Sequence, residues 1–126
     1  MKSETAYQKP LVFEDLGNGT THYNYNITEK DHTNEDGEVT PGYECDQVTI
    51  HGDVTSSKVI SVVIREKYSA DKEFALINNY NRYQLATSAD KDESYKTEYL
   101  AYLSDRTSIK AMVKTDCKTY NIVMDD

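Results

Sequence analysis

The chain has 126 residues, of which 29% are charged and 37% hydrophobic. This length and composition are typical of one folded domain and are too apolar for a disordered tail. Fourteen basic residues against 22 acidic ones give a net charge of −8, which argues against general nucleic-acid binding and against docking on an anionic membrane. No apolar run approaches the roughly 20 residues that cross a bilayer. The first residues form no apolar h-region, so we expect no secretory signal peptide.

The negative charge is unevenly distributed along the sequence. Residues 1–54 hold three lysines against eleven acidic residues, whereas residues 55–126 hold eleven charges of each sign. Two interpretations are open: a solvated acidic surface that aids solubility, or a surface that meets a basic partner.

The N-terminal half reads as strands. An apolar run at residues 11–16 is followed by the turn Gly17-Asn18-Gly19 and by residues 20–28, in which Thr21, Tyr23, Tyr25 and Ile27 alternate with polar residues. Alternation with a period of two on either side of a glycine-rich turn predicts a β-hairpin.

A polar, acidic segment at residues 29–42 follows the hairpin and contains Glu35, Asp36 and Glu38. It is longer than most connections, so it is either mobile or a contact element. Residues 43–51 then predict a third strand. Its alternation slips between Cys45 and Val48, which indicates either a β-bulge or burial on both faces.

The C-terminal half reads as three helices. The first helix has candidate N-caps at Thr55-Ser56-Ser57 and runs through the β-branched run 59–64. The second helix has a candidate N-cap at Ser69 and spans about 16 residues. The second helix has Phe74, Ile77 and Tyr80 at helical spacing. The third, over residues 93–117, has its apolar stripe at spacings of four and three, and the stripe consists of Tyr95, Tyr99, Tyr102, Arg106, Ile109 and Val113.

These elements predict an α+β fold in which a three-stranded antiparallel meander packs on three α-helices. We expect a single domain over residues 1–126. Residues 1–54 form the β-hairpin, the acidic loop and the third strand, residues 55–118 form three helices, and residues 119–126 form a tail. The second and third helices form an antiparallel hairpin because their link is short.

No motif for catalysis or cofactor binding is present. The Gly17-Asn18-Gly19 turn is not followed by the Lys or the helix of a phosphate-binding loop. An EF-hand register that uses Gly37 places His32 and Tyr43 where carboxylates are required. Cys45 and Cys117 are 72 residues apart and belong to no Cys/His cluster, so we expect free thiols. The sequence therefore predicts no catalytic residue, no metal, no cofactor and no enzyme.

The aromatic composition is skewed, with eleven Tyr, two Phe and no Trp. Tyrosine suits surfaces that are covered by partners; the alternative is that these tyrosines line a small core with their hydroxyls at the rim. The residues that we predict at a protein interface are Tyr23, Tyr25, Glu35, Asp36, Glu38, Tyr43, Tyr80 and Tyr83.

Several segments together resemble small uncharacterised proteins of phages and prophages of Bacteroides-type gut bacteria. They are residues 9–14 (KPLVFE), 43–45 (YEC), 75–81 (ALINNYN) and 99–106 (YLAYLSDR), with Asp116-Cys117. The resemblance spans nearly the whole chain and brings no established functional residues. It implies a virion building block, an assembly helper or an anti-defence inhibitor.

We therefore expect a non-enzymatic phage structural protein, associated with the tail or capsid of the virion and acting through protein–protein contacts. Its partners would be other virion proteins, in a homo-oligomer or a larger assembly, without nucleic acid or membrane. Its location would be the virion or the bacterial host cytoplasm. The alternatives are an acidic anti-defence inhibitor that mimics nucleic acid and a tail-fibre assembly chaperone.

Overall fold

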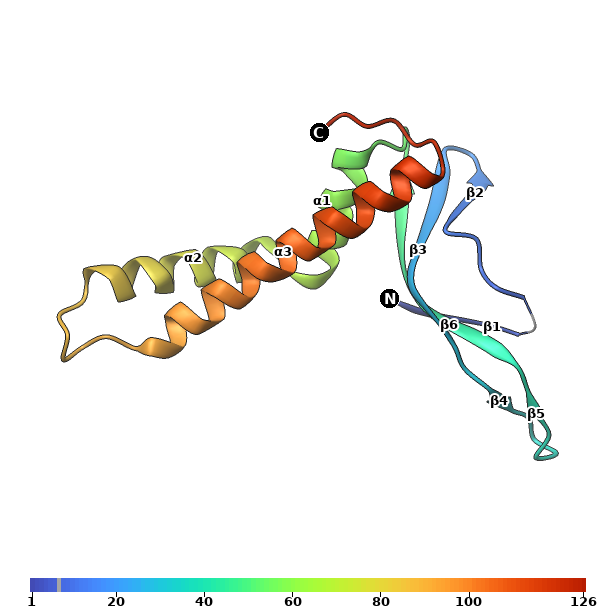
Figure 1. Ribbon diagram of the computed structural model, residues 1–126, viewed down its shortest axis with the longest axis horizontal. Helices are drawn as coiled ribbons and strands as arrows, with labels where there is room; N and C mark the ends of the chain where they lie inside the picture. The colour runs from blue at the N-terminus through green and yellow to red at the C-terminus, as the bar shows by residue number, and fades with distance from the viewer. Residues whose placement is uncertain (7) are drawn as a thin grey trace.

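The computed structural model, which describes residues 1–6 and 8–126, consists of one main sheet, a small β-ribbon and three helices (Figure 1). Four strands form the main antiparallel sheet in the order β1-β6-β3-β2: β1 (Lys2–Ala6), β6 (Gly42–His51), β3 (Thr20–Glu29) and β2 (Phe13–Gly17). The ribbon pairs β4 (His32–Thr33) with β5 (Val39–Thr40). The helices are α1 (Ser56–Lys67), α2 (Ala70–Leu85) and α3 (Glu93–Thr119).

The predicted α+β class is confirmed, and the meander β2-β3-β6 is present. The strand number was wrong, because β1 adds a fourth strand at the free edge of β6. The sequence of β1 gave no strand signal, since it is mostly polar and lacks apolar alternation. It pairs along the charged part of β6, where Lys2 lies opposite Asp46.

The predicted hairpin joins β2 and β3 through its glycine-rich turn. Asn18 and Gly19 have φ angles of 54° and 70°, a conformation that glycine and asparagine adopt most readily. The Asp15 carboxylate accepts a hydrogen bond from the Gly17 amide at 2.8 Å and closes the turn.

The irregularity predicted in the third strand lies instead in its neighbour. In β3 the register shifts between Tyr25 and Thr28, at Asn26, whose φ is 52°. In β6, Cys45 and Val48 are both buried, and an odd spacing places their side chains on opposite faces of the strand. Of the two sequence-based interpretations, burial on both faces is therefore the one observed.

The hydrophobic core lies between one face of the sheet and two of the helices. The sheet contributes Tyr23, Val48 and Ile50, and α1 and the C-terminal half of α3 contribute Val59, Ile60, Val63, Ile64, Val113 and Cys117. The stripe predicted on α3 is confirmed, because each of its members is buried or half-buried.

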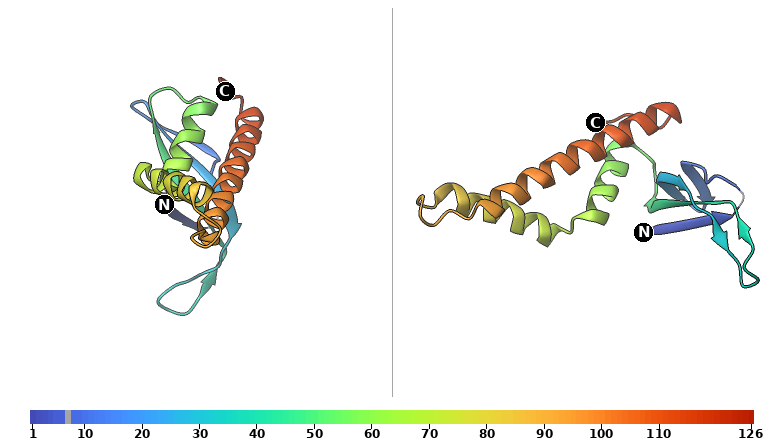
Figure 2. Two further views of the ribbon diagram at one scale, coloured as in Figure 1. Left: turned by 90° about the vertical axis from the view of Figure 1, so that its left-hand side faces the viewer. Right: turned by 60° about the horizontal axis from the view of Figure 1, so that its bottom comes forward.

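Helix α2 does not belong to this core. It contributes no buried residue, and with α3 it projects away from the sheet (Figures 1 and 2). The expectation that three helices cover the sheet was therefore wrong, since α1 and α3 do so alone. Phe74, placed by helical spacing on a buried stripe, is 66% exposed and Ile77 is 40% exposed. We call residues 70–106 the arm and the remaining described residues the body.

Local signals for the helix ends are confirmed. The Thr55 hydroxyl accepts a hydrogen bond from the Lys58 amide at 3.3 Å, and the Ser69 hydroxyl accepts one from the Lys72 amide at 3.1 Å. The C-terminal segment returns to α1, where Asp125 accepts from the Ser57 amide at 2.9 Å. A carboxylate at this position stabilises the helix N-terminus. None of the helices in residues 1–6 and 8–126 is long and apolar enough to cross a membrane.

Candidate protein-contact surfaces

The base of the arm is held by a polar cluster around Glu73. Its carboxylate lies 2.7 Å from Arg65 Nη1 of α1 and 3.6 Å from Arg106 Nη1 of α3. It also accepts a hydrogen bond from the hydroxyl of Tyr102, which is buried. The Tyr102 hydrogen bond and the Arg65 guanidinium hold the pKa of Glu73 below its usual value. This cluster joins all three helices and sets where the arm leaves the body.

A second polar contact lies on the other side of this junction. The Tyr68 hydroxyl donates to Asp105, and Lys67 Nζ lies 2.9 Å from the same carboxylate. Burial, with this hydrogen bond, raises the pKa of Tyr68 to about 12. The Tyr68 and Tyr102 rings meet edge to face, with centroids 4.9 Å apart. The carboxylates of Glu73 and Asp105, at the base of the arm, are therefore both paired with side chains of the same chain.

Further along the arm, stacked tyrosines join α2 to α3. Tyr80 stacks on Tyr99 with a centroid distance of 4.3 Å, and on Tyr83 at 6.0 Å. Lys91 lies 4.7 Å from the Tyr83 ring. Tyr80 and Tyr83, both predicted at an interface, are half-buried in this internal stack. They hold the two helices together.

The outer face of α2 presents apolar side chains to solvent. Phe74 is 66% exposed and Leu85 87% exposed. At the side of this face that is next to α3, Phe74 and Ile77 line a shallow groove with Tyr102 and Arg106. No charged residue occurs between Glu73 and Arg82 in a chain that is 29% charged. Exposed apolar side chains on an uncharged helical segment mark a candidate face for another polypeptide.

The predicted acidic loop is a second projecting element and contains the two short strands β4 and β5. Strands β4 and β5 extend the β3–β6 pair into a ribbon, and the turn is built on Asn34, whose side-chain oxygen accepts from the amides of Asp36 at 3.0 Å and Glu38 at 2.9 Å. Glu35, Asp36 and Glu38 are all exposed at this tip. The structure therefore brings these three predicted residues together on one turn.

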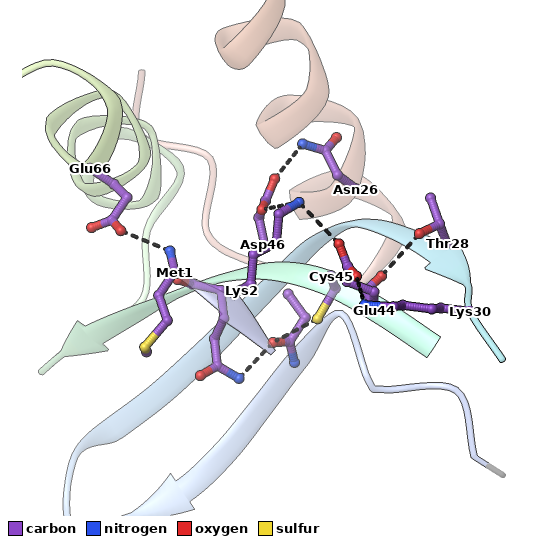
Figure 3. Close-up of polar contacts among 11 residues, drawn as sticks. Met1, Lys2, Asn26, Thr28, Lys30, Glu44, Cys45, Asp46 and Glu66 are labelled. Carbon is purple, nitrogen blue, oxygen red and sulfur yellow. Dashed lines mark hydrogen bonds and ion pairs between the residues drawn. The ribbon is translucent and has the colours of Figure 1, made fainter. Parts of the chain in front are cut away.

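The sheet surface beyond the helices carries paired charges (Figure 3). Lys2 Nζ lies 2.8 Å from Asp46, and Lys30 Nζ lies 2.8 Å from Glu44 and 2.7 Å from Glu4. These residues share a sheet face with the core, since β6 residues 44, 46, 48 and 50 alternate onto one side. The face changes from apolar to charged where the helices stop covering it.

A groove of about 420 Å³ lies at this boundary, between the sheet and helices α1 and α3. Its apolar lining comes from Tyr25, Val63, Ile109 and Met112. The Tyr25 ring stacks on Tyr23 at 5.1 Å, and burial raises the pKa of Tyr25 to about 12. Tyr25 is thus half-buried at the edge of the core and only partly available for contact.

The remaining two residues predicted at an interface are Tyr23 and Tyr43, and they lie in different environments. Tyr23 is 0% exposed, and its hydroxyl donates to Asp116 of α3 at 2.6 Å. It belongs to the core and offers no surface to a partner, so its assignment to an interface was wrong. Tyr43 is half-buried in β6, opposite Glu29 of β3. The predicted residues therefore occupy four separate places and form no single site.

The two thiols are free, as expected, and both are fully buried. Cys117 lies in the core beneath the sheet. Cys45 lies on the opposite face, where its Sγ is 3.7 Å from the side-chain oxygen of Asn24. Burial raises the pKa of both thiols, that of Cys117 to about 11. Both are therefore protonated at neutral pH, and among the described residues no group of three or more His, Cys, Asp or Glu residues is arranged to hold a metal ion.

Comparisons with known proteins give this chain no family: no protein-family model matches it, and neither a curated protein nor a solved structure does. The resemblance to phage proteins stays a prediction from the sequence. The outer face of α2 is the surface that sequence reasoning missed. Its signal was present in the charge-free stretch 74–81, of which sequence reasoning used only the helical spacing of Phe74, Ile77 and Tyr80.

Proposed function

We propose that this protein is a non-enzymatic structural protein of a bacteriophage particle, attached at the tail or capsid, and that it acts through contacts with other polypeptides. The observation that carries the proposal is the arm. Its helix α2 has 16 residues and no buried side chain, so much of the chain is ordered without adding to the core.

Physical considerations support a contact role for such an element. Ordering one residue costs about 1–2 kcal/mol of backbone entropy, and a helix without buried side chains recovers little of it from the hydrophobic effect. The polar cluster at Glu73 and the tyrosine stack keep α2 in place. A surface that is held rigid and left apolar gains its stabilisation when a partner covers it.

The test is the composition of purified particles. We expect quantitative mass spectrometry of gradient-purified virions to find this protein at a fixed ratio to the major capsid protein. The double variant Phe74→Ser/Leu85→Ser should fold and be depleted from particles, whereas Leu16→Ser, an exposed apolar residue of β2, should be incorporated normally. Absence of the wild-type protein from particles would reject the proposal. Absence combined with binding to unassembled tail-fibre protein would instead indicate an assembly chaperone.

A second candidate, an acidic inhibitor of a nucleic-acid-binding host protein, is favoured by the β4–β5 tip. Glu35, Asp36 and Glu38 are exposed together there, and residues 1–54 carry the whole net charge of −8. This candidate predicts binding to a basic protein that weakens steeply with salt. Glu35→Gln/Asp36→Asn/Glu38→Gln should abolish that binding, whereas Asp90→Asn/Glu93→Gln/Glu98→Gln on the arm should not. Equal binding by both triple variants would reject it.

A further inference from the structure

The outer face of α2 is self-complementary. Asp71 lies in its first turn and Arg82 in its last, and the eight residues 74–81 between Glu73 and Arg82 are uncharged. Glu73 points inward, to Arg65 and Tyr102. Within the described part of the chain, neither Asp71 nor Arg82 has an ion-pair partner. The face is thus acidic at one end, basic at the other and neutral in the middle.

Helical geometry places these residues on one side. At 100° per residue, Asp71, Phe74, Asn78, Arg82 and Leu85 fall within about 80° of each other around the helix axis. They point away from the tyrosine stack that joins α2 to α3. In Figures 1 and 2, no other element lies along this outer side of α2.

We propose that this face binds a second copy of the chain, with the two α2 helices antiparallel about a two-fold axis. An axis beside residues 76 and 77 brings Asp71 of each copy level with Arg82 of the other, because the two residues lie equally far along the helix from that point. The uncharged segments then meet in the middle, where Phe74 of each copy lies level with Asn79 of the other and loses its exposure to water.

Symmetry and architecture favour this occupant. A two-fold contact uses the same patch on both copies and makes each favourable charge pair twice. It also brings two exposed α2 helices side by side, so that each α2 covers the outer face of the other. The bodies lie at opposite ends of the paired arms, since each arm projects away from its own sheet (Figure 1). One helix face per copy is a small interface, for which we expect a dissociation constant that is roughly micromolar.

This inference rests on the proposed contact role of the arm, and its outcome is separate from that of the virion test. Dimerisation without incorporation into particles would support the inference and reject the phage role. Incorporation into particles of a protein that is monomeric in solution would support the phage role and reject the inference.

The experiment is sedimentation velocity of the purified chain from about 1 to 300 μM, which brackets a micromolar dissociation constant. We expect a monomer–dimer equilibrium. Phe74→Glu, which buries a charge in the interface, should raise the dissociation constant at least roughly tenfold. The matched control is Leu100→Glu on α3, which is also exposed and lies about 200° around the helix from Tyr102; it should leave dimerisation unchanged.

Charge reversal tests the antiparallel register. Asp71→Arg and Arg82→Asp should each weaken the dimer by roughly three- to tenfold, and the double variant should restore it. Circular dichroism of each variant confirms that the arm is folded. A monomer at 300 μM, or a dimer that Phe74→Glu and the single reversals leave unchanged, would overturn the proposal.

Discussion

The body and the arm of this protein use similar residue types for opposite purposes. In the body, Ile50 and Val113 are fully buried between the sheet and the helices. In the arm, Phe74 and Leu85 face solvent, and the two helices are joined by stacked tyrosines and a polar cluster. The difference shows that a helical apolar pattern predicts a face that is buried against another surface. It does not indicate whether that surface belongs to the same chain.

The largest expected effect is a difference in the free energy of unfolding when one isoleucine in each region is replaced by alanine. Ile50→Ala removes a side chain with no exposure from the core and should lower the free energy of unfolding by about 2–5 kcal/mol. Ile77→Ala, in the arm, should lower it by less than about 1 kcal/mol, because Ile77 is already 40% exposed. Urea denaturation at low micromolar concentration measures both. Equal losses would contradict the division into body and arm.

A smaller effect is expected where the sheet joins α3. Tyr23→Phe removes the hydroxyl that donates to Asp116 at 2.6 Å and leaves the carboxylate without this donor. Hydrogen bonds to charged groups contribute about 1.5–3 kcal/mol, so we expect a loss of that order in the same denaturation experiment. Tyr43→Phe, at a half-buried tyrosine of β6, is the control and should change stability little.

The cluster at the base of the arm predicts a pH dependence. The folded-state pKa of Glu73 is lowered, first by the Tyr102 hydrogen bond, so its ionised form stabilises the folded state above the usual glutamate pKa. This contribution is lost as the pH falls through the lowered pKa. The wild type should therefore exceed Glu73→Gln in stability at pH 7, and the gap should close below about pH 4. A gap that stays constant with pH would show that the charge of Glu73 contributes nothing.

The smallest effect is expected on the charged sheet surface of Figure 3. Lys30 pairs with Glu4 and Glu44 at 2.7 and 2.8 Å, but Lys30 and Glu4 are exposed and Glu44 is only half-buried. Solvent and salt screen such pairs. Lys30→Ala should therefore leave the urea midpoint unchanged within error at physiological salt, and a marked shift would show that this network stabilises the sheet.

Much of the fold followed from local chemistry in the sequence. The caps at Thr55 and Ser69, the turn at Gly17–Gly19 and the stripe on α3 each depend on neighbouring residues, and each was predicted. Strand β1 was missed because its place depends on long-range pairing with Asp46 and its neighbours, which a polar sequence of five residues does not indicate.

The contact surfaces were harder to predict because burial is a property of the folded chain. Glu35, Asp36 and Glu38 were placed correctly at an exposed position by their polarity. Tyr23 was misplaced because tyrosine serves cores and interfaces equally well, and only the donation to Asp116 distinguishes the two. Phe74 shows the converse, since its helical spacing is the same as that of a buried stripe and yet the side chain is 66% exposed.

Native-state hydrogen exchange of the α2 amides tests the central claim most directly. At 1 μM the amides of α2 should exchange much faster than those of β3 and β6, because few buried contacts oppose local opening of the arm. At 300 μM, above a roughly micromolar dissociation constant, α2 should become protected while the sheet amides stay the same. Equal protection of α2 and the sheet, independent of concentration, would contradict the account.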